Sequence, residues 1–323
     1  SDRKAILFST RLGWSKAVDN LASKAQKAIG MLRCFESKCG KLSYNIAFHI
    51  FDRMILPILL YGSEVWGVDY CEKIEKVQTK FCKYFLGLPM SASNAAVLGE
   101  CGRYPLSVHY LKRSIKYWIK LVHMDTSRYP SQCYNMLRML DEAGRVTWAT
   151  RMKQLLYKLG FGFVWISQDI GNVQLFMSEI DQRLKDIALQ NWQSDLNENS
   201  KLTNYVQFKT LLNTERYVKG LKEFKLRKAL AKLRTSCHML NIELGRHDNI
   251  DKEFRFCSFC LCEGLSSIED EVHFLCLCSK YDDIRRKYLP ELIDVSVSNA
   301  LHKFVKLMTS EDLGSIVNLS LFI

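Results

Sequence analysis

Five of the chain's twelve cysteines lie within one 22-residue segment, and a histidine lies among them. These residues are Cys257, Cys260, Cys262, His273, Cys276 and Cys278. Four of them have the spacing C-x2-C-x12-H-x4-C, in which the long gap and the last gap both fall within the range of zinc fingers. Zinc binds four soft or borderline ligands at tetrahedral corners, and two close pairs of such residues can supply them. We therefore predict a zinc site with the ligands Cys257, Cys260, His273 and Cys278.

The main alternative to a metal site is a set of disulfides or of unrelated buried thiols. Disulfide frameworks belong to small secreted chains, and nothing in this sequence resembles a signal peptide. The spacing leaves the choice of ligands open, because Cys262 and Cys276 could each replace a neighbouring cysteine. Four protein ligands leave no open position for a catalytic water, so the predicted zinc has a structural role.

The composition is that of globular material. The chain has 323 residues, of which 48% are hydrophobic, with only five prolines. No apolar run approaches the 18 residues of a membrane span, so we expect no membrane partner. The seven cysteines outside the cluster are scattered, which fits a reducing compartment and an intracellular location, nuclear or cytoplasmic.

The apolar periodicity predicts a mainly α-helical fold. We expect helices at 15–38, 43–60, 72–86, 91–99, 105–123, 130–140, 146–159, 173–196, 203–212, 223–240, from 279, at 297–308 and at 311–321. Strands are expected only at 5–9 and in a short hairpin under the zinc site. Residues 160–162 and 197–200 are the best linker candidates. The first residues resemble an internal segment of a longer protein, so we interpret the chain as a fragment.

Basic residues recur along three of these helices, and the net charge is +12. The residues are Lys73, Lys76, Lys80 and Lys83; Lys112, Lys116 and Lys120; and Lys225, Arg227, Lys228, Lys232 and Arg234. A single lysine stripe is usually a solvated helix face. Three stripes with few balancing acids indicate a nucleic-acid surface, because each phosphate neutralised releases counterions. Tyr110, Tyr117 and Trp118 could stack on bases, but their helical spacing favours a place in the core.

No segment predicts an active site. Lys280-Tyr281-Asp282-Asp283 lacks the residue that separates tyrosine from the aspartates in polymerase hairpins, so we interpret the acids as first-turn helix residues. The acids at 269–271 are interpreted as a solvated lead-in to His273 rather than a magnesium site.

Several strings in the chain, taken together, resemble non-LTR retrotransposon (LINE-type) reverse transcriptases. They are LFS at 7–9, LGWSKA at 12–17, ILPILLYGSEVWG at 55–67, IEKVQ at 74–78, GECGRYPL at 99–106, GRVTW at 144–148, CSFC at 257–260 and EDEVHFL at 269–275. The resemblance covers nearly the whole chain and follows the catalytic palm of that family. It implies contacts to RNA template and target DNA, a palm domain missing from this chain, and a zinc-knuckle-like element closed by Cys278, with Cys276 as the extra cysteine.

On this basis we divide the chain into six segments. They are the residual end of a palm strand (1–13), a helical thumb-like region (14–125), a helical linker region (126–200), a basic helical segment (201–252), a zinc-binding element (253–290) and C-terminal helices (291–323). The prediction is a non-catalytic, nucleic-acid-binding part of a reverse transcriptase. The alternative is a zinc-stabilised protein-interaction scaffold from a decayed or repurposed element.

Overall fold

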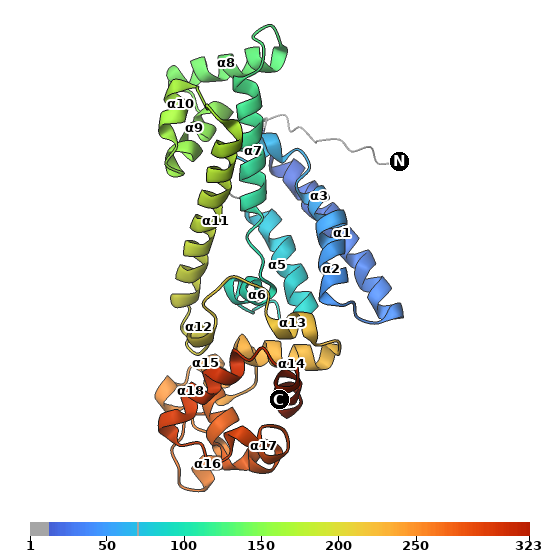
Figure 1. Cartoon of the computed structure of the whole chain (residues 1–323), viewed down its shortest axis with the longest axis vertical. Coiled ribbons are helices and arrows are strands. Elements are labelled where there is room, and N and C mark those ends of the chain that lie inside the picture. Colours follow the sequence, from blue (N-terminus) through green and yellow to red (C-terminus); the bar gives the residue numbers. More distant parts are fainter. Residues whose placement is uncertain (1–12, 70) are drawn as a thin grey trace. The chain divides into compact units, whose positions relative to one another are not determined.

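The structure, a computed structural model, describes residues 13–69 and 71–323 and confirms the mainly α-helical fold class (Figure 1). Among the described residues, β pairing is limited to one antiparallel bridge between Phe256 and Ile268. The predicted hairpin under the metal site is therefore reduced to this bridge. The strand predicted at 5–9 lies outside the described residues.

The helices follow one another with short connections. In chain order they are α1 Ser15–Cys39, α2 Tyr44–Ile50, α3 Leu56–Leu59, α4 Ser63–Trp66, α5 Glu72–Leu86, α6 Asn94–Cys101, α7 Ser107–Val122, α8 Tyr129–Glu142, α9 Trp148–Lys158, α10 Gly162–Ser167, α11 Val173–Asn197, α12 Tyr205–Phe208, α13 Arg216–Gly220, α14 Phe224–Arg234, α15 Asn241–His247, α16 Ser258–Cys262, α17 Asp282–Tyr288, α18 Val297–Met308 and α19 Leu313–Phe322. Two π-helical turns, η1 Phe51–Ile55 and η4 His273–Leu277, and four 3-10 turns, η2 Ser200–Leu202, η3 Lys252–Phe254, η5 Ser279–Tyr281 and η6 Pro290–Leu292, complete the description.

Two compact units make up the described chain, and each combines segments that are distant in the sequence. Unit 1 contains the described residues up to Gly40 together with Phe48–Gln78 and Tyr104–Asn191. Unit 2 contains Lys41–Ala47, Thr79–Arg103 and Trp192–Ile323. Helices α2, α5 and α11 contribute residues to both units.

The core of unit 1 is built around Trp118 of α7, which is fully buried. Its indole N–H donates to the Tyr134 hydroxyl at 2.8 Å, and that hydroxyl donates to the Gln168 side chain at 2.8 Å. The Trp118 ring also stacks on Trp165, with centroids 6.1 Å apart. Tyr110 is buried as well, and Tyr117 packs edge-on against Trp148. The core interpretation of these α7 aromatic residues is therefore confirmed.

The long helices α7 and α11 run side by side within unit 1 (Figure 1), and Lys112 of α7 is ion-paired with Asp181 of α11. Gly67, at the end of α4, allows close approach to α7. A Cβ at this position would lie 3.1 Å from the Tyr110 Cβ and 3.2 Å from the Ser114 hydroxyl oxygen. Ser114 in turn donates to the Ser63 carbonyl at 2.8 Å. The YGSEVWG string at 61–67 thus forms the turn and short helix that pack on α7.

Three predicted helices differ from those observed, each for a local reason. The helix expected at 43–60 contains the π-helical turn η1 just before Pro57. Proline has no N–H to donate, and its ring clashes with the carbonyl group four residues earlier, so the preceding turn widens. The helix expected at 203–212 stops at Phe208, where the buried Lys209 turns to bond Asn213 and Glu215. The helix expected at 223–240 stops at Arg234, because Ser236 adopts a left-handed backbone with φ of 52°.

Unit 2 is held together by indole and hydroxyl donors to the backbone of α6. Trp192 donates to the Ala95 carbonyl at 2.8 Å, and Tyr205 donates to the Ala96 carbonyl at 3.2 Å. Phe208 packs edge-on against Phe304 of α18. None of the helices in the described residues combines the length and apolar character needed to cross a membrane.

Glu75 of α5 is a buried acid that caps the first turn of α7. Its carboxylate accepts from the backbone N–H groups of Leu106 at 2.8 Å and of Ser107 at 2.7 Å. Burial raises the pKa of this carboxyl from 4.5 to about 7, although its hydrogen bonds to Leu106, Ser107 and Tyr110 work in the opposite direction. Folding therefore favours the protonated acid. This contribution to stability is fully present below about pH 4.5 and is lost as the pH rises through 7.

We expect Glu75→Gln to remove this pH dependence, because the amide resembles the protonated acid. The unfolding free energies of wild type and E75Q are measured in urea at each pH. The wild-type value minus the E75Q value should fall by about 3 kcal/mol between pH 4.5 and 8. Glu72 is the control: it lies one turn earlier on α5, its side chain is 65% exposed, and E72Q should show no such trend. A difference between wild type and E75Q that rises with pH would contradict the assigned pKa.

Candidate metal centre

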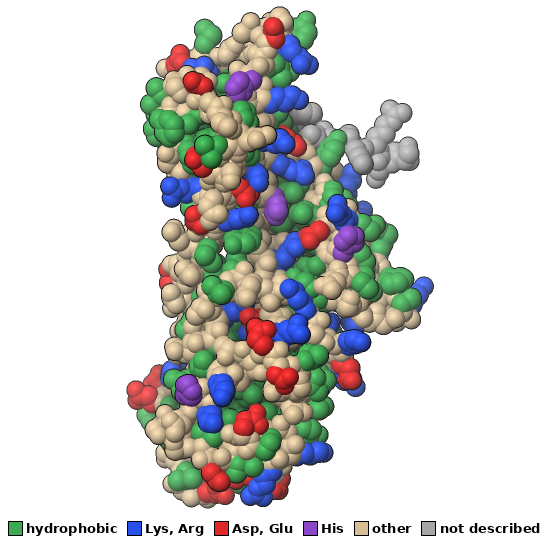
Figure 2. Space-filling view, viewed as in Figure 1, with side chains coloured by type: hydrophobic (Ala, Val, Ile, Leu, Met, Phe, Trp, Pro, Cys, Tyr) green, Lys and Arg blue, Asp and Glu red, His purple; other side chains and the backbone are tan. Residues whose placement is uncertain are grey.

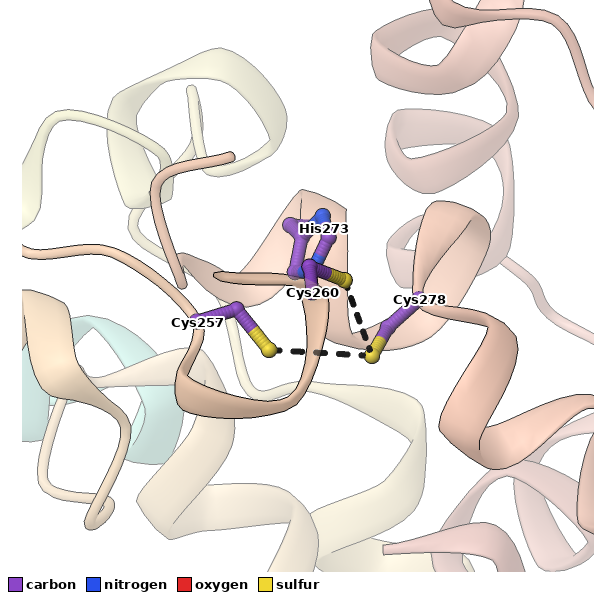
Figure 3. A group of neighbouring side chains, drawn as sticks. All are labelled: Cys257, Cys260, His273 and Cys278. Carbon is purple, nitrogen blue, oxygen red and sulfur yellow. Dashed lines mark hydrogen bonds between the residues drawn. The ribbon is translucent and has the colours of Figure 1, made fainter. Parts of the chain in front are cut away.

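Four side chains from the cysteine-rich segment converge in unit 2. The sulfur atoms of Cys257, Cys260 and Cys278 and a ring nitrogen of His273 all lie within 4.8 Å of one another, and all four residues are buried (Figure 3). The Cys257 and Cys260 sulfurs each lie 3.8 Å from the Cys278 sulfur, and the Cys260 sulfur lies 3.4 Å from His273 Nε2. The structure therefore brings together the four predicted ligands in a group that could hold a metal ion.

The π-helical turn η4 brings His273 and Cys278 to the same side of the chain. In an α-helix, residues five apart lie roughly 140° from each other around the axis and point in different directions. Here the Cys278 N–H donates to the His273 carbonyl at 2.9 Å, the i→i+5 bond that defines a wider turn. Asp270 accepts from the His273 N–H at 2.8 Å and fixes the start of this turn.

The other two ligands lie on a turn tied to the single β bridge. Cys257 precedes α16, its N–H donates to the Ser267 carbonyl at 2.8 Å, and its carbonyl accepts from the Leu261 N–H at 2.9 Å. This closed turn directs Cys257 and Cys260 toward the same point (Figure 3). The observed geometry is the one that the C-x2-C spacing predicts.

The distances fit a metal site and do not fit a disulfide. A disulfide requires sulfurs about 2.05 Å apart, and every cysteine of this chain is a free thiol. Metal–thiolate bonds of about 2.3 Å in a tetrahedron place the sulfurs about 3.8 Å apart, the separation found twice here. Burial raises the pKa of the Cys278 thiol to about 12 and lowers the pKa of His273. A neutral imidazole is the form of histidine that binds a metal.

The two remaining cysteines of the segment lie outside the group. Cys262 is exposed at the end of α16. Cys276 is buried, but its thiol is directed at the Ala300 carbonyl, 3.7 Å away. Neither residue replaces a predicted ligand in this structure.

The acids at 269–271 are structural, so their interpretation as a solvated lead-in is wrong. Glu269 accepts from the Asn241 N–H at 2.8 Å, and Asp270 bonds His273 as described above. Glu271 is buried and accepts from the side chains of Asn204, Ser236 and His238. These three donors come from segments outside the cysteine-rich region, so Glu271 fastens the candidate metal-binding element, residues 253–290, to the rest of unit 2. Its bonds also lower the pKa of the Glu271 carboxyl, against the effect of burial.

Asp282 and Asp283 occupy the first turn of α17, as predicted. Both are ion-paired within that helix, Asp282 with Arg285 and Asp283 with Arg286. Arg285, which the sequence analysis missed, is buried next to the metal group.

The twelve basic residues predicted to contact nucleic acid have three kinds of surroundings. Lys83, Arg227 and Arg234 are buried. Lys73, Lys76 and Lys112 are ion-paired with Asp19, Glu72 and Asp181. The other six, which are Lys80, Lys116, Lys120, Lys225, Lys228 and Lys232, are exposed or half-buried and have no acidic partner in the part of the chain that the structure describes. Figure 2 shows basic side chains interspersed with acidic ones over one face.

The three buried residues correct the prediction, because their charges are bound inside unit 2. The Lys83 ammonium donates to the Met90 carbonyl at 2.8 Å. The Arg227 guanidinium lies 4.2 Å from the Phe85 ring centroid and donates to the Leu221 carbonyl. Arg234 is ion-paired with two glutamates. A phosphate could reach these groups only if they left their partners.

Comparison with family models, with curated proteins and with solved structures found no match for this chain.

Proposed function

We propose that the metal of this centre is zinc and that its role is structural. Three thiolates and one imidazole are a ligand set that zinc prefers, and the 3.8 Å separations support a tetrahedral ion. Four protein ligands leave no position for a substrate or a catalytic water. Bound zinc would stabilise the cysteine-rich segment, whose β pairing is a single bridge between Phe256 and Ile268.

We further propose that the chain binds nucleic acid, as a non-catalytic part of a retrotransposon reverse transcriptase. RNA template and target DNA are the proposed partners, and the catalytic palm would be supplied elsewhere. The observation that carries this proposal is the division of α14 into two basic faces. Lys225, Lys228 and Lys232 lie on one face at three- and four-residue spacing, and Arg227 and Arg234 lie on the opposite, buried face.

Aromatic rings lie beside this lysine face of α14. The ammonium of Lys41 lies 4.1 Å from the Tyr84 ring centroid and 5.2 Å from that of Phe224. Phe224 and the aliphatic stem of Lys228 both lie against Gly87, where a Cβ would meet each of them within 3 Å. Single-strand binding surfaces combine lysines that bind phosphates with rings on which bases stack, and here a base would take the place of Lys41 over Tyr84 and Phe224. The resemblance of the chain to LINE-type enzymes supports the same reading.

The lysine face of α14 can be tested by its salt dependence. We expect a labelled single-stranded RNA or DNA oligomer to bind the wild-type chain with an affinity that falls steeply with salt. The triple variant K225Q/K228Q/K232Q should bind about tenfold more weakly at about 100 mM salt. It should also lower the slope of log affinity against log salt by about 2 to 3. Fluorescence anisotropy over a salt series measures both quantities.

The control is a second triple variant of equal charge on other exposed lysines of unit 2, K252Q/K287Q/K306Q. It should retain most of the wild-type affinity. If both triple variants lost the same affinity, the loss would reflect net charge alone, and the α14 face would not be the binding surface. Absence of binding at low salt would reject the nucleic-acid proposal.

One observation favours the alternative of a protein-interaction scaffold. Helix α8 of unit 1 exposes an apolar stripe in which Tyr129 is 82%, Met136 54% and Met139 69% exposed. Exposed apolar residues at helical spacing are suited to a protein partner. If the wild-type chain binds no nucleic acid, this second function becomes the leading one.

A further inference from the structure

Arg285 is a buried arginine whose bonds all end within the metal-binding element. Its side chain is 3% exposed. Its Nε donates to the Leu275 carbonyl at 2.8 Å, its Nη2 donates to the Cys278 carbonyl at 3.0 Å, and its Nη1 is ion-paired with Asp282. The guanidinium therefore joins α17 to the backbone of the turn that carries two ligands.

These bonds act on the backbone that positions Cys278. Leu275 lies inside the π-helical turn η4, and Cys278 is the first residue after it. One rigid guanidinium holds both carbonyls, so the turn can neither tighten to an α-helical turn nor open without breaking a bond to a charged group. The position of the Cys278 sulfur relative to His273 depends on this turn, because the two ligands approach each other only in the wider geometry.

The charge of Arg285 also matches what a bound ion would leave uncompensated. Three thiolates, one neutral imidazole and a divalent ion sum to a net charge of −1. Such a buried negative charge is costly unless a cation lies near it. Arg285 is buried in the same element, and its Nη2 lies 3.0 Å from the carbonyl oxygen of the ligand Cys278.

We infer that Arg285 is a positioning residue for the metal site, which holds the η4 turn in its ligand-bearing geometry and offsets the charge of the occupied site. The inference rests on the proposed zinc site. Partners of this kind typically change metal affinity ten- to hundredfold when they are removed.

The experiment measures zinc affinity of the full chain by competition with a chromophoric chelator. We expect R285M to bind zinc ten- to hundredfold more weakly than wild type. R285K should recover part of that loss, because lysine keeps the charge but cannot bond both carbonyls in a fork. The matched control is R286M: Arg286 is the next residue of α17, its side chain is 64% exposed, and its loss should leave the affinity unchanged.

Cobalt substitution separates a positioning role from a general loss of stability. Bound Co²⁺ reports its ligand geometry by absorption, and we expect an altered spectrum in R285M and the wild-type spectrum in R286M. Zinc affinity of R285M within about threefold of wild type, with an unchanged cobalt spectrum, would overturn the inference. If R285M does not fold, R285K is the deciding variant. Wild-type zinc affinity in R285K would show that the two carbonyl bonds do not position the ligands. A wild-type chain that takes up no zinc would reject the metal proposal itself, an outcome distinct from these.

Discussion

Replacement of Cys257 by serine or of His273 by alanine is expected to abolish tight zinc binding and to unfold the metal-binding element around residues 253–290. The ligands of the proposed site are spread over a turn, a π-helical turn and the residue after it, and a single β bridge pairs the strand-like parts. Without the ion, burial keeps the Cys278 thiol protonated, since its pKa is raised to about 12. Structural zinc in small elements supplies about 10–16 kcal/mol of apparent binding free energy at neutral pH. The hydrogen bonds of Glu271 and Arg285 remain without the ion, but each bond to a charged group typically contributes only about 1.5–3 kcal/mol.

Zinc content by elemental analysis and helix content by circular dichroism test this prediction. The wild-type chain should hold about one zinc per molecule, as one four-ligand site requires. C262S is the control from the same segment, because Cys262 is exposed outside the group, and it should keep the metal. C276S is a stricter control: Cys276 is buried but directed at the Ala300 carbonyl, so it should keep the metal with a modest loss of stability. Retention of zinc by C257S would disprove the ligand assignment.

The metal group could be predicted from the sequence because its information is local. Two cysteines three apart occupy one turn in almost any fold, and a histidine and cysteine five apart need only one wider turn to meet. The spacing therefore predicts that each pair of ligands lies on one turn, although it does not show that the second turn is π-helical. It also could not separate Cys276 from Cys278, which differ by two residues and point to different neighbours.

The basic residues show where sequence reasoning fails. Periodicity places Lys225, Lys228 and Lys232 on one face of α14, and Arg227 and Arg234 on the other. It does not show which face the fold covers. The distinction between the two residue types is a signal that could have helped, since arginine is more weakly hydrated than lysine and stacks on rings. Both arginines of α14 do so, on Phe85 and on Phe208.

Long-range partners could not be predicted at all. Glu271 is bonded by three side chains from 33 to 67 residues away, and nothing in the string at 269–271 separates a buried acid from a solvated one. Lys41 is equally hidden, because its approach to Tyr84 and Phe224 depends on the packing of three separate segments. Such residues are found only when the fold is known.

The second large effect is expected at Arg234, whose guanidinium is the centre of a buried charge network. It donates to both oxygens of Glu100 at 2.8 and 3.1 Å and is ion-paired with Glu215 at 2.7 Å. Its third nitrogen donates to the Met308 carbonyl at 2.6 Å, and the group lies over the Phe208 ring. Burial alone would lower the pKa of Arg234, but the two glutamates raise it above its ordinary value, so the residue is charged at every accessible pH.

We expect R234M to lower the unfolding free energy by about 3–5 kcal/mol, because it leaves the Glu100 carboxylate buried without its cation. E100Q should cost a similar amount by leaving the guanidinium without its bidentate partner. The double variant R234M/E100Q should cost clearly less than the sum, since it removes both charges of the pair, while Glu215 keeps Lys209 as a partner. Urea unfolding followed by circular dichroism measures all three, and R286M, which alters an exposed arginine, should stay within about 0.5 kcal/mol of wild type. Full additivity of the two single variants would show that the pair is not coupled. If R234M lowers the unfolding free energy by less than about 1 kcal/mol, the network is open to water. Arg234 would then again be a candidate for contact with a phosphate.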